Sequence, residues 1–243
     1  MNPTRRQVRD PRGEGVSRPG AWVTCLAGAL GGARKLALGL ALASVVPAAG
    51  CASSKPPAVD FAAAPEDYRA EDYPVVYERW TRHEKVTANL ESAIEVWATY
   101  KSRDYREAFV ARYAEAYAMG DADRERLLQA QREAAAGEYE FMVTAQSANY
   151  RWNDLERKNS PWRVTLVDGA GREISPEELR IEKLPDLFER EFFPVKTPFT
   201  RTYVVRFLRS AGKDDGFAGD RSGRIVLRFA GPLGRADLIW SAR

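Results

Sequence analysis

The sequence predicts a mainly β domain, built as an antiparallel β-sandwich with an inserted α-helical hairpin. Three observations carry this prediction. Short runs of alternating apolar and polar residues are separated by Gly, Pro and Asp, which is typical of antiparallel strands joined by turns. A repeated strand–helix pattern, which would predict a parallel sheet, does not occur in the sequence. A single segment, residues 104–137, has the spacing of two consecutive helices.

The expected strands occupy most of the chain after residue 72. In the clearest one, residues 92–100, the apolar side chains at alternate positions from Ile94 to Tyr100 share one face, and Glu95 and Thr99 fall on the other. The other expected strands are 73–80, 139–145, 162–168, 202–208, 224–230 and 236–242. Residues 179–184 could form either a short strand or a helical turn. This series of short strands predicts a sandwich that is Ig-like in general architecture.

The helical hairpin is expected between the second and third of these strands. Asp104 followed by Glu107 is typical of a capping box, Gly120 ends the first helix, and Asp121 caps a second helix that runs to Gly137. Four aromatic residues recur at every fourth position and therefore share one helical face: Tyr105, Phe109, Tyr113 and Tyr117. Packing of this stripe on the sheet is the simpler interpretation, and one wall of an apolar ligand groove is the alternative.

The N-terminal part of the chain has the order of an export signal. Arg34 and Lys35 precede an apolar run at 36–46, and small residues at 48–50 lead to Cys51. The run is shorter than the ~20 apolar residues that a membrane-spanning helix needs. We therefore expect a cleaved signal at this place.

The end of this segment resembles the lipobox of bacterial lipoprotein signals, in which a small residue and then Gly or Ala precede the cysteine. Ala49, Gly50 and Cys51 match that pattern, and Ala48 stands where Leu is usual. The resemblance implies that the Cys51 thiol receives a diacylglycerol and that the chain is cut after Gly50. The cysteine would then hold the protein at a membrane.

The sequence divides into three parts on this interpretation. Residues 1–50 are the export signal, residues 51–70 are the acylated cysteine with a flexible tether rich in Pro and Ala, and residues 71–243 are a single domain. Ala52, directly after the cysteine, favours the outer membrane over the inner membrane for such a lipoprotein. Which side of the membrane the domain faces is left open.

The charge balance changes when the export signal is removed. The whole chain has 37 Lys and Arg and 34 Asp and Glu. Residues 1–50 contain seven of the basic and two of the acidic residues, so the remainder has 30 and 32, a net charge of −2. A nucleic-acid partner is not expected, because no basic stripe with interleaved aromatic residues follows Cys51. Cys25 lies in the signal, so the domain itself has no cysteine for a disulfide or a metal site.

Residues that could carry catalysis are sparse. His83 is the only histidine, in a charged stretch expected to form an exposed strand, and the sequence has no G-x-S-x-G motif. Clustered carboxylates occur at Glu177 and Glu178, at Glu189 and Glu191, and in the loop 211–223 at Asp214, Asp215 and Asp220. A hairpin loop is the simpler interpretation of 211–223, and a calcium site is the alternative. We expect no catalytic residue, cofactor or metal.

The leading functional hypothesis is a lipid-anchored envelope protein whose domain binds or scaffolds a protein partner and is not an enzyme. One alternative is a carrier or chaperone for an apolar ligand, with the aromatic helix as a wall of its pocket. The other alternative is an envelope hydrolase that uses carboxylates, which would require an acidic pair across a cleft.

Overall fold

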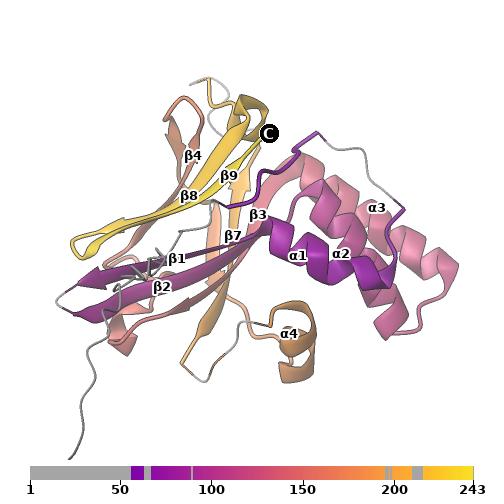
Figure 1. Ribbon diagram of the computed structural model, residues 1–243, viewed down its shortest axis with the longest axis horizontal. Coiled ribbons are helices and arrows are strands. Elements are labelled where there is room, and N and C mark those ends of the chain that lie inside the picture. Colours follow the sequence, from indigo (N-terminus) through magenta and orange to yellow (C-terminus); the bar gives the residue numbers. More distant parts are fainter. Residues whose placement is uncertain are drawn as a thin grey trace, which may run out of the picture. The chain divides into compact units, whose positions relative to one another are not determined.

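Two antiparallel sheets with helices beside them make up the described part of the protein (Figure 1). The computed structural model describes residues 56–62, 67–88, 90–194, 197, 199–209 and 216–242. The export signal, Cys51 and two of the loop carboxylates, Asp214 and Asp215, lie outside these residues. The mainly β fold predicted from the sequence is confirmed.

The first sheet has five strands in the order β1-β2-β3-β7-β6. Their bounds are β1 (Thr81–Ala88), β2 (Glu91–Tyr100), β3 (Glu138–Gln146), β6 (Glu178–Ile181) and β7 (Arg201–Leu208). The second sheet has four strands in the order β5-β4-β8-β9, namely β4 (Arg163–Asp168), β5 (Glu173–Ile174), β8 (Arg224–Gly231) and β9 (Gly234–Ser241). Every neighbouring pair is antiparallel.

The inner faces of the two sheets form the core, as the period-two pattern predicts. On β2 the inward side chains are those at alternate positions from Ile94 to Tyr100, all fully buried. Trp240 of β9 contacts Tyr100 and Phe141 of the other sheet, with ring centroids 6.2 and 5.3 Å apart. Large aromatic side chains therefore join the sheets, and they bury much apolar area at each contact.

The helical hairpin is confirmed between β2 and β3, as α2 (Arg103–Ala116) and α3 (Asp121–Gly137). Its caps differ from the prediction. Ser102 is the N-cap of α2, and its Oγ accepts a hydrogen bond from the Tyr105 N–H at 3.1 Å. The N-cap of α3 is Gly120, without a side-chain cap. Asp104 is instead drawn inward, away from the backbone amides that it would have capped.

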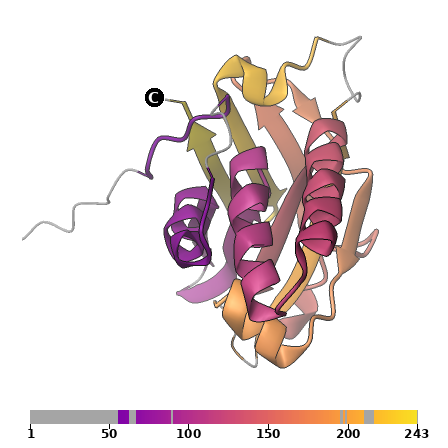
Figure 2. The same ribbon diagram turned by 90° about the vertical axis from the view of Figure 1, so that its right-hand side faces the viewer.

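Residues 73–80 form a helix, α1 (Tyr73–Trp80), so the strand predicted there is wrong. Tyr73, Val76, Tyr77 and Trp80 are buried, and this i, i+3, i+4, i+7 spacing is that of one helical face. Pro74 lies in the first turn, where its missing N–H costs nothing. The β-branched and aromatic composition favoured a strand, and the packing of the helical face outweighed it. Figure 2 shows α1, α2 and α3 side by side in front of the sheets.

Two connections also differ from expectation. Residues 179–181 belong to strand β6, so this segment is a short strand. A helix that was not predicted, α4 (Asp186–Phe192), follows it. The loop 211–223 leads from β7 to β8, which belong to different sheets, so it is not a hairpin loop. Three short 3-10 helices complete the described elements: η1 (Ala70–Asp72), η2 (Tyr150–Trp152) and η3 (Gly219–Ser222).

Part of the segment predicted to be a tether packs on the domain. The Val59 N–H donates to Ser241 O at 2.9 Å, and Val59 forms a parallel bridge with Ala242 at the edge of β9. Val59 and Tyr68 both belong to the buried core. The packed chain therefore begins closer to Cys51 than the boundary expected at residue 71.

Candidate functional site

The aromatic stripe of α2 is divided between the interior and the surface. Tyr105 is buried, Phe109 and Tyr113 are half-buried, and Tyr117 is 54% exposed. The stripe is covered mainly by helices and not by the sheet. Phe192 of α4 lies against Phe109 and Tyr113, with ring centroids 5.1 and 6.0 Å apart. Helix α4, which was not predicted from the sequence, therefore covers the aromatic residues considered as a ligand wall.

Buried phenols hold α1, α2 and α4 together. The Tyr73 hydroxyl lies 2.9 Å from the Tyr105 hydroxyl and donates to Phe192 O at 2.7 Å. Burial raises the pKa of Tyr73 and of Tyr105 well above the ordinary tyrosine value. Both phenols therefore stay protonated at neutral pH, and their arrangement is that of a structural clamp.

A small cavity remains beside the stripe, between α4 and the outer face of the five-stranded sheet. Its volume is about 190 Å³. Its apolar lining is Phe109, Met142, Leu184, Phe188, Phe193 and Val204, and its charged lining is Lys101, Glu140, Arg180 and Glu182. Pockets for small molecules usually measure about 300–1,000 Å³. The cavity has room for a group the size of an aromatic ring.

A charged cluster lies at the end of this cavity. Glu140 accepts from Lys101 Nζ at 2.6 Å and from Arg106 Nη2 at 2.7 Å. Burial disfavours the ionised form of Glu140, but the two cations outweigh it and lower its pKa to about 2. Arg106 is only 2% exposed, and it also donates to Lys101 O and to Gln131 Oε1 of α3. The cluster fastens the helical hairpin to β3.

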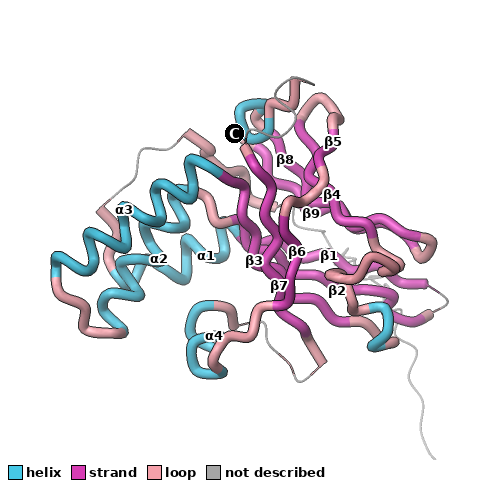
Figure 3. Tube along the Cα trace, turned by 180° about the vertical axis from the view of Figure 1, so that it is seen from behind, coloured by secondary structure: helices cyan, strands magenta, loops and turns pink. Residues whose placement is uncertain are grey.

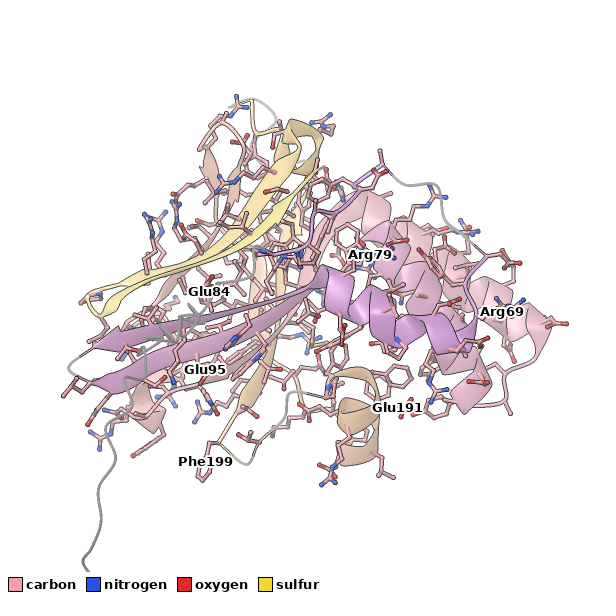
Figure 4. All side chains as sticks on the ribbon, in the orientation of Figure 1. Arg69, Arg79, Glu84, Glu95, Glu191 and Phe199 are labelled. Carbon is pink, nitrogen blue, oxygen red and sulfur yellow. The ribbon has the colours of Figure 1, made fainter. Side chains whose placement is uncertain are left out.

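Asp104 performs a similar role on the other side of α2. Its buried carboxylate accepts from Trp80 Nε1 at 2.7 Å, from Arg79 Nη1 at 3.1 Å and from the Tyr68 hydroxyl. In Figure 4 Arg79 lies where α1 meets this region. The three donors join α1 and the segment before it to α2, so the buried carboxylate of Asp104 has a structural role.

His83 lies on β1 and is half-exposed, as predicted. Its ring stacks on Trp97 with centroids 4.6 Å apart, and its Nε2 lies 3.0 Å from Glu95 Oε1. Burial opposes ionisation of Glu95, but hydrogen bonds from Gln146 and His83 outweigh this and lower its pKa. A triad would need a nucleophile against the other ring nitrogen, and the described residues place none there.

The carboxylate pairs do not face each other across a cleft. Glu189 is buried and accepts from the Thr202 hydroxyl, whereas Glu191 lies on the exposed side of α4 and binds Arg112. Glu178 pairs with Arg206 at 2.6 Å. Among the described residues, no group of three or more His, Cys, Asp or Glu side chains is arranged to hold a metal ion.

A different surface stands out on the four-stranded sheet, at the right of the view in Figure 3. Ile225, Leu227 and Phe229 of β8 point into the core between the sheets, so the alternate positions lie on the outer side. Thr165, Val167 and Val226 on this side are also buried, and arginines lie around them. We call these arginines the arginine face: Arg163 on β4, Arg224 and Arg228 on β8, and Arg235 on β9.

Two arginines of this face have no acidic partner among the described residues. Arg228 lies between Asp237, at 2.9 Å, and Glu173, at 2.6 Å, and Arg235 lies 3.3 Å from Asp237. Within the described ranges, no carboxylate lies within ion-pair distance of Arg163 or Arg224. The sequence contained a signal for this face, because two expected strands, 162–168 and 224–230, carry arginines at alternate positions and Arg235 directly precedes a third. The order of the strands was needed to bring them together.

The N-terminal segment runs along the edge of the arginine face. Arg82 of β1 is buried, has no acidic partner in the part of the chain that the structure describes, and donates to backbone carbonyls, among them Pro57 O at 2.8 Å and Ile239 O at 2.7 Å. Burial lowers its pKa to about 10. A mostly apolar groove of about 320 Å³ lies here, lined by Pro56, Pro57, Ala58, Arg224, Ile239, Ser241 and Ala242.

No protein-family model, curated protein or solved structure matches this chain. Helices within the described ranges are all too short or too polar to cross a membrane. The observations above therefore define a class by architecture, a mainly β, sandwich-like domain with a helical insert. Its two distinctive features are the aromatic stripe of α2, which other helices cover, and the arginine face.

Proposed function

We propose that this protein is a lipid-anchored component of a bacterial cell envelope whose domain binds another envelope protein without catalysing a reaction. The order of residues from Arg34 to Cys51 carries the proposal, since charge, apolar run, small residues and cysteine follow in the sequence that such an anchor requires. The position of Val59 supports it, because the chain reaches the domain only eight residues after Cys51. We favour the outer membrane, given Ala52.

The partner-binding surface that we propose includes α4 and the segment after it. Leu187 and Phe199 are 81% and 80% exposed, although both are large and apolar. Figure 4 shows Phe199 at the tip of its loop, directed away from the ribbon. Large apolar side chains that are exposed in this way are typical of protein contact sites.

The carrier hypothesis has less support. Phe188 and Phe192 of α4 and Tyr73 of α1 occupy the space over the aromatic stripe, and the remaining cavity measures about 190 Å³. A lipid or other long apolar ligand would require α4 to move. The stripe residues of α2 are therefore better assigned to packing.

The hydrolase hypothesis has one supporting observation. Glu138 and Glu140 lie on the same face of β3, and their pKa values are shifted apart: burial chiefly raises that of Glu138, while Lys101 and Arg106 lower that of Glu140. Separated carboxyl pKa values are typical of acid–base pairs. However, each carboxylate oxygen of Glu140 already accepts from a cation, and the bond from Arg106 joins α2 to β3.

The anchor is tested by the mass of the mature N-terminus in producing bacterial cells. We expect a chain that begins at Cys51 and carries the added mass of a diacylglycerol, and we expect globomycin to block its maturation. Cys51→Ala should abolish acylation, whereas the matched variant Cys25→Ala should leave it unchanged. A retained leader or an unmodified Cys51 would contradict the proposal.

The partner surface is tested by photocrosslinking in the same cells. A photoreactive residue at position 187 or 199 should give a discrete crosslinked protein. The control is the same residue at position 90, because Leu90 is fully exposed and lies in the turn between β1 and β2. Equal products at all three positions would contradict a specific binding surface on α4.

A further inference from the structure

We propose that the arginine face and the groove beside it rest on the anionic phospholipid surface of the membrane that holds Cys51. The inference depends on the proposed lipid anchor and adds to it the orientation of the domain. It assigns one side of the sandwich to the membrane.

The chain between the proposed anchor and the domain is short. Pro57 is tied to Arg82, and Val59 is tied to Ser241, both by hydrogen bonds to buried or strand-bound groups. Pro57 is the sixth residue after Cys51, and six residue steps of fully extended chain span at most about 22 Å. An acylated Cys51 would therefore keep the β9 edge of the four-stranded sheet close to the bilayer.

The arginine face also has an excess of positive charge. The arginine face has four cations and two carboxylates, and Asp237 and Glu173 are already engaged with Arg228 and Arg235. Arg163 and Arg224 are exposed and have no acidic partner within the described residues. The guanidinium group binds phosphate through paired N–H donors. Cations beside an anionic leaflet are attracted to it over about a Debye length, ~8–10 Å at ordinary salt.

The groove beside the arginine face also suits a phospholipid. It adjoins the place where the chain reaches the domain, and its lining combines Pro56, Pro57 and Ile239 with the cation of Arg224. An apolar lining with one cation at its side fits a phospholipid, whose anionic phosphate stands next to apolar glycerol and acyl groups. A purely ionic contact would not need such a groove. Cavity, charge and chain path therefore point to the same surface.

The orientation leaves the opposite side of the sandwich for other contacts. The outer face of the five-stranded sheet bears α4 and the loop with Phe199, which are the proposed partner-binding elements. One face of the domain would thus meet the membrane, while the other would be presented away from it.

The test measures how close each side lies to the lipid headgroups. The acylated protein is purified from producing cells and reconstituted into phosphatidylcholine vesicles with or without phosphatidylglycerol. Because the mature chain would have no thiol besides the acylated Cys51, a single introduced cysteine can be labelled with a fluorophore. Ala230→Cys reports on the arginine face, and Ala130→Cys on α3 is the control. Quenching by headgroup spin-labelled lipid is then compared.

We expect several-fold stronger quenching at position 230 than at 130, only in vesicles with phosphatidylglycerol, and weaker quenching at raised salt. The double variant Arg163→Glu, Arg224→Glu should lose this difference and still float with the vesicles. The matched variant Arg124→Glu, Arg126→Glu on α3 should keep it.

The outcomes separate the two proposals. The membrane-facing surface would be contradicted if protein that floats with the vesicles is quenched equally at both positions, or if the quenching does not depend on phosphatidylglycerol. Either result would still be consistent with the anchor. Protein that carries no acyl group and does not float would instead overturn the proposed function.

Discussion

The outer faces of the two sheets both carry many charged residues, but they use them differently. On the five-stranded sheet, Glu140 is enclosed by Lys101 and Arg106, and helices α1 and α4 pack over the strands. On the four-stranded sheet, Arg163 and Arg224 are exposed, and the described residues offer them no carboxylate. Charge in one face therefore holds the fold, while charge in the other is available to an external anion.

Removing a charge from the cluster around Glu140, on the five-stranded sheet, should give the largest effect on stability. Arg106→Ala removes a buried cation and leaves Glu140 and Gln131 with unmet acceptors. We expect a loss of about 3–5 kcal/mol in the free energy of unfolding, since half of a buried ion pair is costly to keep. Urea unfolding of the mature chain measures it. A loss below about 1 kcal/mol would mean that the cluster does not hold the hairpin to β3.

Low pH should reduce the stability that the cluster around Glu140 contributes. The pKa of Glu140 is about 2, below the ordinary 4.5, so its contribution is complete above pH 4.5 and is lost as the pH falls toward 2. We expect the difference in stability between the wild type and Glu140→Gln to shrink by about 2 kcal/mol from about pH 5 to about pH 3. A difference that stays constant over this range would show that Glu140 is not ionised against its two cations.

The phenol clamp should give a smaller effect. Tyr73→Phe removes the hydroxyl that serves both Tyr105 and Phe192 O, and it should cost about 1–2 kcal/mol because buried polar groups lose their partner. The matched change Tyr117→Phe, at the exposed end of the stripe, should cost less than about 0.5 kcal/mol. Equal costs would contradict the division of the stripe into buried and exposed parts.

The arginine face should give the smallest effect on stability. Arg163→Ala and Arg224→Ala remove exposed cations without a described partner, so each should change the free energy of unfolding by less than about 0.5 kcal/mol. Urea unfolding again measures this. A loss as large as that of Arg106→Ala would show that these arginines hold the fold, and it would remove the contrast between the two faces.

The strands were predictable because burial of one face imposes a period of two. That pattern placed β2, β3, β4, β7, β8 and β9 within a few residues. Residues 73–80 were misjudged because Val75, Val76 and two tyrosines favour strands by composition, while their spacing favours a helix. The spacing of Phe188 and Phe192 behind Pro185 was the signal for α4, but only seven residues carry it.

The surfaces were less predictable than the strands. Arg163, Arg224 and Arg235 stand far apart in the sequence, and their shared face depends on the order β4-β8-β9 and its register. Likewise, composition marked residues 52–70 as a tether, whereas the hydrogen bond from Val59 to Ser241 depends on where β9 ends. Long-range contacts of this kind are not encoded in local pattern.

Hydrogen exchange of the acylated protein, in detergent and on vesicles with phosphatidylglycerol, compares the two faces in one sample. We expect vesicles to slow exchange in peptides that cover residues 56–62 and 234–242, where the N-terminal segment meets β9, and to leave the exposed turn between α2 and α3 unchanged. If vesicles slow exchange at α3 and α4 but do not slow it at β9, the result would contradict a membrane-facing arginine face.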